Sequence, residues 1–151
     1  MGRQEIVDEI LMLLPVLGRE LGRPSAGELE EIVRCGLPVD VQLSTGHIQA
    51  LIALSRGPRS VGELAEAVGV SRPAMTQILD RLEGHGMVRR RPHPGDRRVV
   101  LVEYVPVMRE VAARLVNRRR AWISRVVDRM SEEEARAFLK GLKMLVAASE
   151  E

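Results

Sequence analysis

Apolar residues recur at steps of three and four along most of this 151-residue chain, and this spacing predicts a mainly helical protein. The first such stretch runs from residue 4 to 21 and is apolar around most of its girth, so this helix needs cover on two sides. Pro15 falls in its middle. A short helix is expected at 25–36, and another from 45 to about 55.

Two short amphipathic helices are predicted at 61–68 and 72–83, each after a serine that can cap it. Ser60 stands three residues before Glu63, which makes a capping box, and Gly69 can end the first helix. Two short helices joined by so tight a turn are the helix-turn-helix pattern, whose second helix enters the major groove of DNA.

Two extended runs follow at 87–91 and 99–102, and the second is β-branched and aliphatic. Pro92, Pro94 and Gly95 lie between them and supply a turn, so the two runs are expected to pair as a β-hairpin. A hairpin directly after a helix-turn-helix is the wing of a winged helix.

Two longer helices are predicted at 106 to about 130 and at 132 to about 148. One face of the first of them carries Val111, Leu115, Trp122 and Val126. The fold class expected is therefore mainly α with a small β-hairpin wing, a winged helix-turn-helix flanked by N- and C-terminal helices.

Charge is distributed unevenly. The net charge is only +2, but five arginines lie between residues 89 and 98 against the single acid Asp96. A local basic patch on a nearly neutral protein indicates a polyanionic partner, and duplex DNA is the one that a winged helix binds.

Other classes of protein are disfavoured. The sequence has no phosphate-binding glycine loop, no nucleophile elbow and no cluster of acid–base residues, so we expect no enzyme activity and no cofactor. A single cysteine excludes an intrachain disulfide and fits a reducing cytoplasm. The apolar run at 10–17 is shorter than the 20 or so residues that span a bilayer, so no membrane association is expected.

The residues expected to contact DNA fall in two groups. On the second helix of the pair, the face away from the core offers Ser71, Arg72, Pro73, Thr76, Gln77 and Arg81. In the wing, the expected contacts are Arg89, Arg91, His93, Arg97 and Arg98, because a cationic loop can enter the minor groove or bind phosphates. The alternative for Arg89–Arg91 is a solvated strand edge, and His93 can equally be solvated.

Several short motifs have a fairly specific spacing. They are Leu43-Ser44, Gly57-Pro58, Val61-Gly62-Glu63-Leu64-Ala65, Val70-Ser71, Thr76, Asp80-Arg81-Leu82-Glu83, Gly86-Met87-Val88, Arg90-Arg91 and Asp96-Arg97-Arg98. Together they resemble the MarR (multiple-antibiotic-resistance regulator) family over residues 43–102. After the wing the chain departs from the family pattern, with Val102–Pro106 in place of a Leu-Thr-x-x-Gly stretch, and the segment 22–42 is longer than usual.

The resemblance implies a homodimeric, sequence-specific repressor or activator that binds a pseudo-palindromic operator. It divides the chain into an N-terminal dimerisation helix and connecting segment at 1–43, a DNA-binding domain at 44–103 and C-terminal dimerisation helices at 104–151. It implies that Asp96 orients Arg98 by an ion pair. It also implies a small-molecule effector, since small anionic or phenolic ligands often bind between the dimerisation helices and the DNA-binding lobe in this family.

Three alternatives stay open. The chain can instead be a winged-helix module that binds proteins and not DNA. Cys35 is a candidate redox residue, although a small apolar filler is the simpler interpretation. His47 and His85 are candidate metal ligands. The sequence shows no spacing typical of metal ligands, however, so we expect no metal.

Overall fold

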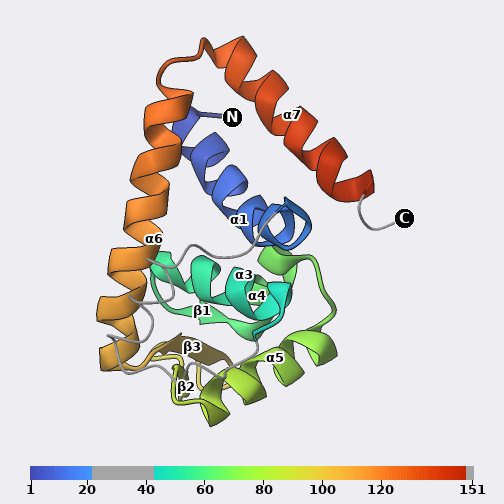
Figure 1. The fold of residues 1–151 in the computed structure, drawn as a ribbon. Helices are drawn as coiled ribbons and strands as arrows, with labels where there is room; N and C mark the ends of the chain where they lie inside the picture. Colours follow the sequence, from blue (N-terminus) through green and yellow to red (C-terminus); the bar gives the residue numbers. More distant parts are fainter. Residues whose placement is uncertain (22–42, 149–151) are drawn as a thin grey trace.

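The computed structural model describes residues 1–21 and 43–148 of the chain (Figure 1). In order, the elements are α1 (Arg3–Leu21), α3 (Thr45–Ala53), η1 (Leu54–Arg56), β1 (Arg59–Ser60), α4 (Val61–Val68), α5 (Arg72–Gly84), β2 (Val88–Pro92), β3 (Val100–Tyr104), α6 (Pro106–Val127) and α7 (Glu132–Ala148). The predicted fold class is confirmed: the protein is mainly helical with one small antiparallel sheet.

The described residues form two hydrophobic cores, one packed against each half of α6; Figure 1 shows the course of this helix between the two lobes. The lower core belongs to the lobe formed by α3, α4, α5 and the sheet, and Leu64, Leu79 and Val102 are completely buried there. The upper core lies between α1, α7 and the second half of α6, around Ile6 and Val127. Each fully buried aliphatic side chain of this size contributes about 1.5–3 kcal/mol.

The sheet has the strand order β1-β3-β2, and both pairings are antiparallel. β2 and β3 form the expected hairpin, with Arg90 opposite Val102. β1 was not predicted from the sequence; it is a strand of two residues in which Arg59 pairs with Val102 and Ser60 with Leu101.

Hydrogen bonds and ion pairs along α1 connect the two ends of the molecule. Arg3 donates hydrogen bonds of 2.8 Å to the carbonyls of Val127 and Met130, at the end of α6. One turn later, Asp8 pairs with Arg120 of α6 (Nε to Oδ1, 3.0 Å) and with Arg56 of η1. The next turn receives a bond from α3, because Gln49 Nε2 donates to the carbonyl of Met12 at 2.9 Å.

Most predicted boundaries hold to within a few residues, and α4 and α7 have the predicted limits. The helix expected to reach about Met130 ends at Val127, because Ser131 and Glu134 already cap the next helix and the chain must turn before them. The short helix expected at 25–36, with Cys35 inside it, lies outside the described residues. Over the described ranges, no helix is long and apolar enough to cross a bilayer.

Candidate nucleic-acid interface

α5 is held with one face inward and the opposite face in solvent. Ser71 caps its N-terminus, accepting a bond from the Ala74 N–H at 3.2 Å. Just before it, Gly69 ends α4 in the left-handed conformation (φ +77°), which a residue with a Cβ rarely adopts. Met75, Leu79 and Leu82 are fully buried. The expected DNA-contacting residues Arg72, Pro73, Thr76, Gln77 and Arg81 are all exposed on the remaining surface.

These side chains are not equally free. The Ser71 hydroxyl is used in the cap, and Thr76 Oγ1 donates to the carbonyl of Arg72 at 3.0 Å. The side chains of Gln77 and Arg81 make no hydrogen bond or ion pair with any described residue. Along α5 they are therefore the groups best able to form new bonds to base edges or phosphates.

Arg72 lies against α4. The space over Gly62 is filled by the Arg72 guanidinium, so a Cβ on Gly62 would stand 2.8 Å from Arg72 Nη2. The missing side chain at Gly62 thus lets the first residue of α5 pack across the helix before it.

Two of the wing arginines share one carboxylate. Glu103 on β3 is nearly buried, and its Oε1 accepts from Arg89 Nε at 3.0 Å and from Arg91 Nε at 3.1 Å. Burial alone would raise the pKa of Glu103, but the hydrogen bonds and positive charges of Arg89 and Arg91 outweigh it and lower the pKa below its usual value. Both arginines are therefore already partnered within the sheet.

Arg90 points to the other face of β2, as the alternation of side chains along a strand requires. Its guanidinium binds α5, with Nη2 at 2.7 Å from Asp80 Oδ1 and Nη1 bonded to Glu83. Arg90 appeared in the sequence only within the motif Arg90-Arg91, and neither Arg90 nor Glu103 was among the expected site residues. Strand alternation alone would have placed Arg90 on the opposite face of β2 from Arg89 and Arg91. The partners of these arginines lie on β3 and α5, so they could not be predicted from the strand itself.

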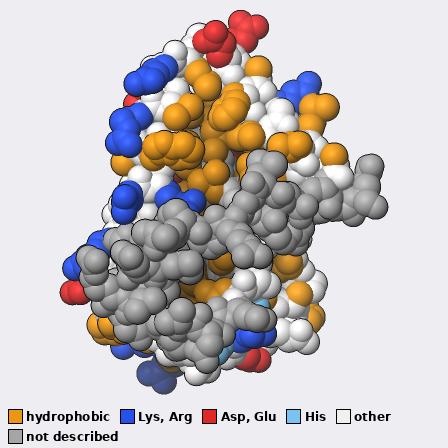
Figure 2. Space-filling model, in the orientation of Figure 1, with side chains coloured by type: hydrophobic (Ala, Val, Ile, Leu, Met, Phe, Trp, Pro, Cys, Tyr) orange, Lys and Arg blue, Asp and Glu red, His pale blue; other side chains and the backbone are white. Residues whose placement is uncertain are grey.

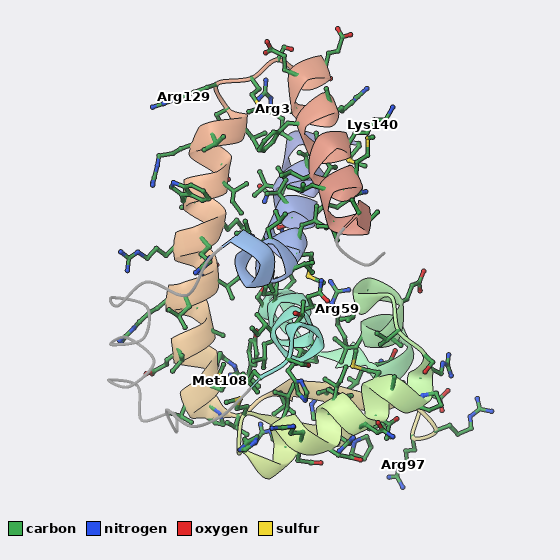
Figure 3. All side chains as sticks on the ribbon, turned by 45° about the vertical axis from the view of Figure 1, so that its right-hand side comes forward. Arg3, Arg59, Arg97, Met108, Arg129 and Lys140 are labelled. Carbon is green, nitrogen blue, oxygen red and sulfur yellow. The ribbon has the colours of Figure 1, made fainter. Side chains whose placement is uncertain are left out.

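The tip of the wing is organised by His93 and Asp96. His93 Nδ1 accepts from the backbone N–H groups of Gly95 (2.9 Å) and Asp96 (3.2 Å). Asp96 in turn accepts from the side chain of Arg98, and these bonds lower the pKa of Asp96. Figure 3 shows Arg97 projecting from the wing into solvent. Its side chain makes no hydrogen bond or ion pair with the described residues.

His47 is a buried polar residue of α3 that lies near Arg81 and His85. With Ser44 it forms the capping box of α3, while its Nε2 is buried without a partner among the described residues. Burial lowers the pKa of His47, and the nearby charges of Arg81 and His85 lower it further. In the parts of the chain that are described, no cluster of three His, Cys, Asp or Glu residues could hold a metal ion.

Comparisons with known proteins agree with this geometry. The MarR family profile matches residues 40–99. The chain is 31% identical over 111 residues to the HTH-type transcriptional regulator YfiV of Bacillus subtilis, an alignment that covers 73% of this chain and 69% of YfiV. It is 40% identical over 65 residues to the HTH-type transcriptional repressor NicR of Pseudomonas putida, covering 42% of this chain and 41% of NicR.

A solved structure shares the fold. The crystal structure of FabT from Streptococcus pneumoniae in complex with DNA superposes with a TM-score of 0.54 at 24% identity. The match covers 81% of this chain and 85% of FabT.

Proposed function

This chain belongs to the MarR family of transcriptional regulators, and from that premise we propose that it represses transcription in the cytoplasm by binding duplex DNA as a homodimer. The family consists of regulators and not enzymes, as the sequence led us to expect. The observation that supports DNA binding best is the combination of an exposed polar face on α5 with Arg97 at the wing tip, which has no side-chain partner among the described residues. FabT was crystallised with DNA, and NicR is a repressor.

In this proposal α5 enters the major groove and the wing the minor groove. Gln77 and Arg81 read base edges, because amide and guanidinium groups form bidentate bonds there. Arg97 and Arg98 provide the positive charge of the wing. Two copies related by a two-fold axis require a pseudo-palindromic operator, with half-sites about one helical turn apart or slightly more.

A second copy of the chain covers the terminal helices in the proposed homodimer. Figure 2 shows hydrophobic side chains gathered between α6 and α7, on the half of the molecule away from the wing. On α7, α1 covers Ala135 and Leu139, while Phe138 and Leu145 stay exposed; on α6, Trp122 is 54% exposed. Aromatic residues left in solvent like this are typical of interface centres. In this proposal the dimerisation segments are residues 1–43 and 104–151, on either side of a DNA-binding domain at 44–103.

A small carboxylate is the effector class that fits the junction of the two lobes. A cavity of about 170 Å³ opens there, lined equally by apolar residues of α1, α3 and α4 and by the polar side chains of Asp8, Ser55, Arg56, Arg59 and Arg120. Asp8 forms ion pairs with Arg56 and Arg120. The side chain of Arg59 makes no ion pair with any described residue, so it is the cation that an entering carboxylate would meet (Figure 3). Isothermal titration with benzoate, comparing wild type with Arg59→Gln, tests this assignment.

The decisive experiment is selection of bound duplexes from a random DNA pool, followed by titration at several salt concentrations. We expect an enriched pseudo-palindrome bound at about 10⁻⁸ M or tighter at physiological salt. A transcription assay with that sequence in a promoter then tests repression. If duplex DNA shows no salt-dependent retention of the protein, the alternative of a protein-binding winged helix is favoured.

A further inference from the structure

We infer that Arg90 is a positioning residue, which fixes α5 against the wing and forms ion pairs with two carboxylates beside the proposed DNA-reading face without touching DNA itself. Its position within the run Arg89–Arg91 suggests a DNA contact, and the contacts of its side chain indicate a different role. The inference rests on the proposed DNA binding.

The partners of Arg90 form one stripe along α5. Its Nη2 is 2.7 Å from Asp80 Oδ1 and 3.4 Å from the carbonyl oxygen of Thr76, and its Nη1 bonds Glu83. Residues 76, 80 and 83 are four and three positions apart, so they follow one another on the same side of the helix. The side chain of Arg90 is 23% exposed, against 63% for Asp80. The guanidinium thus lies between strand and helix, with its donors directed at α5.

This arrangement constrains the orientation of α5. The buried residues Met75, Leu79 and Leu82 anchor the helix along one line, and such an anchor alone permits the helix to roll. A planar guanidinium that spans two turns opposes rolling, because its donors have fixed directions. Through Arg90 the wing and α5 move as one unit, and the two are presented to adjacent grooves at a constant angle.

The same contacts reduce the negative charge that Asp80 and Glu83 would bring near DNA. Asp80 and Glu83 share α5 with Gln77 and Arg81, so in a DNA complex both carboxylates come near phosphates, where negative charge is repelled. Arg90 compensates one of the two charges and satisfies both acceptors. If Arg90 only positions α5, neutral amides at positions 80, 83 and 90 should be able to take over its function. If Arg90 contacts a phosphate, no neutral side chain could replace it.

The test uses three variants of the full chain: Arg90→Gln, Arg90→Lys, and the triple variant Arg90→Gln/Asp80→Asn/Glu83→Gln. Arg97→Gln is the matched control for a true phosphate contact. The duplex selected by the wild-type protein is titrated at 50–300 mM KCl, and amide hydrogen exchange is followed without DNA.

We expect Arg90→Gln to weaken binding about tenfold and to speed exchange in residues 76–84 by about fivefold, with unchanged exchange in α7. The affinity and the exchange rates of Arg90→Lys should lie between those of wild type and Arg90→Gln, because lysine keeps the positive charge but lacks the planar set of guanidinium donors. The triple variant should return to within about threefold of wild-type affinity and keep the wild-type salt slope, whereas Arg97→Gln should reduce that slope by about 0.9.

Two results would overturn the inference. One is a triple variant that stays weak with a salt slope lowered by about 0.9, which identifies Arg90 as a phosphate contact. The other is unchanged exchange in residues 76–84 of Arg90→Gln. If the wild-type protein binds no duplex at any salt concentration, the proposed function fails, and the exchange measurement alone still decides whether Arg90 positions α5.

Discussion

Asp96 holds Arg98 through three hydrogen bonds at the tip of the wing. The backbone N–H of Arg98 donates to Asp96 Oδ1 at 3.0 Å, its Nε donates to the same oxygen at 3.1 Å, and its Nη2 donates to Oδ2 at 3.2 Å. The Arg98 side chain is nevertheless 90% exposed. Asp96 therefore fixes the direction of a guanidinium that remains available to a partner.

Replacing this carboxylate should reduce specificity more than affinity. In Asp96→Ala the Arg98 side chain keeps its charge but loses its fixed direction. We expect binding to the selected duplex to weaken about three- to tenfold and binding to random duplex to stay equal or rise, because a nearby negative charge is gone. Competition titrations measure the ratio of the affinities for the selected duplex and the random duplex. An unchanged ratio would show that the orientation of Arg98 is irrelevant to recognition.

Replacing Glu103 should change the salt dependence of DNA binding in the opposite sense from replacing a wing-tip arginine. Glu103→Gln removes the carboxylate that occupies Arg89 and Arg91, so these arginines become available to phosphates. We expect a salt slope for random duplex that is steeper by about 0.9 for each arginine that engages, together with a lower melting temperature. Arg97→Ala is the comparison, and its slope should be shallower by about 0.9. Equal slopes in Glu103→Gln and wild type would contradict the prediction.

His47 should make stability depend on pH. Its pKa in the folded state lies below the unfolded value of 6.5, so the unfolded chain takes up the proton first as the pH falls. The stability that neutral His47 contributes is complete above pH 6.5 and is lost as the pH drops toward the folded-state pKa. Melting temperatures measured between pH 7.5 and 5 should fall in the wild-type protein.

The control is His47→Gln, because glutamine at the third helical position also closes a capping box but does not titrate. Its melting temperature should change less over the same range. Identical pH profiles would remove His47 as the cause.

Trp122 should be essential for the dimer. Placing a charge there by Trp122→Asp should raise the dimer dissociation constant by about 30-fold or more, since central aromatic residues contribute at least about 2 kcal/mol to interfaces. Light scattering over a concentration series measures it. Val107→Asp is the matched control: Val107 is also on α6 and is 59% exposed, but it lies at the end nearest the sheet. Loss of the dimer in both variants would argue against a specific surface.

Local sequence signals account for much of the fold. α4 and α7 have the predicted limits, because a serine–glutamate capping box fixes the start of each. β1 could not be predicted in this way. Arg59 and Ser60 have no strand signal of their own, and they are extended only because they pair with Val102 and Leu101, about 40 residues later.

The site was predictable as a surface but not as a network. The helical period placed Thr76, Gln77 and Arg81 on one exposed face, and composition located the basic wing. The division of the wing arginines depends on the register of β2 against β3, which brings Glu103 opposite Arg89. Such pairings come from tertiary structure, so no count of charges along the chain reveals which cations remain available. The expected DNA contacts themselves remain predictions.

The bonds along α1 make the junction between the lobes sensitive to small movements of that helix. Arg3 and Met12 are nine residues apart, a rise of about 14 Å, and between them α1 is fastened to α6, η1 and α3. A tilt of about 4° over that length moves its far end by about 1 Å, enough to break a 3 Å hydrogen bond. The lower lobe is bonded to α1 through Asp8 and Met12, so a tilt of a few degrees of this helix would be enough to release it.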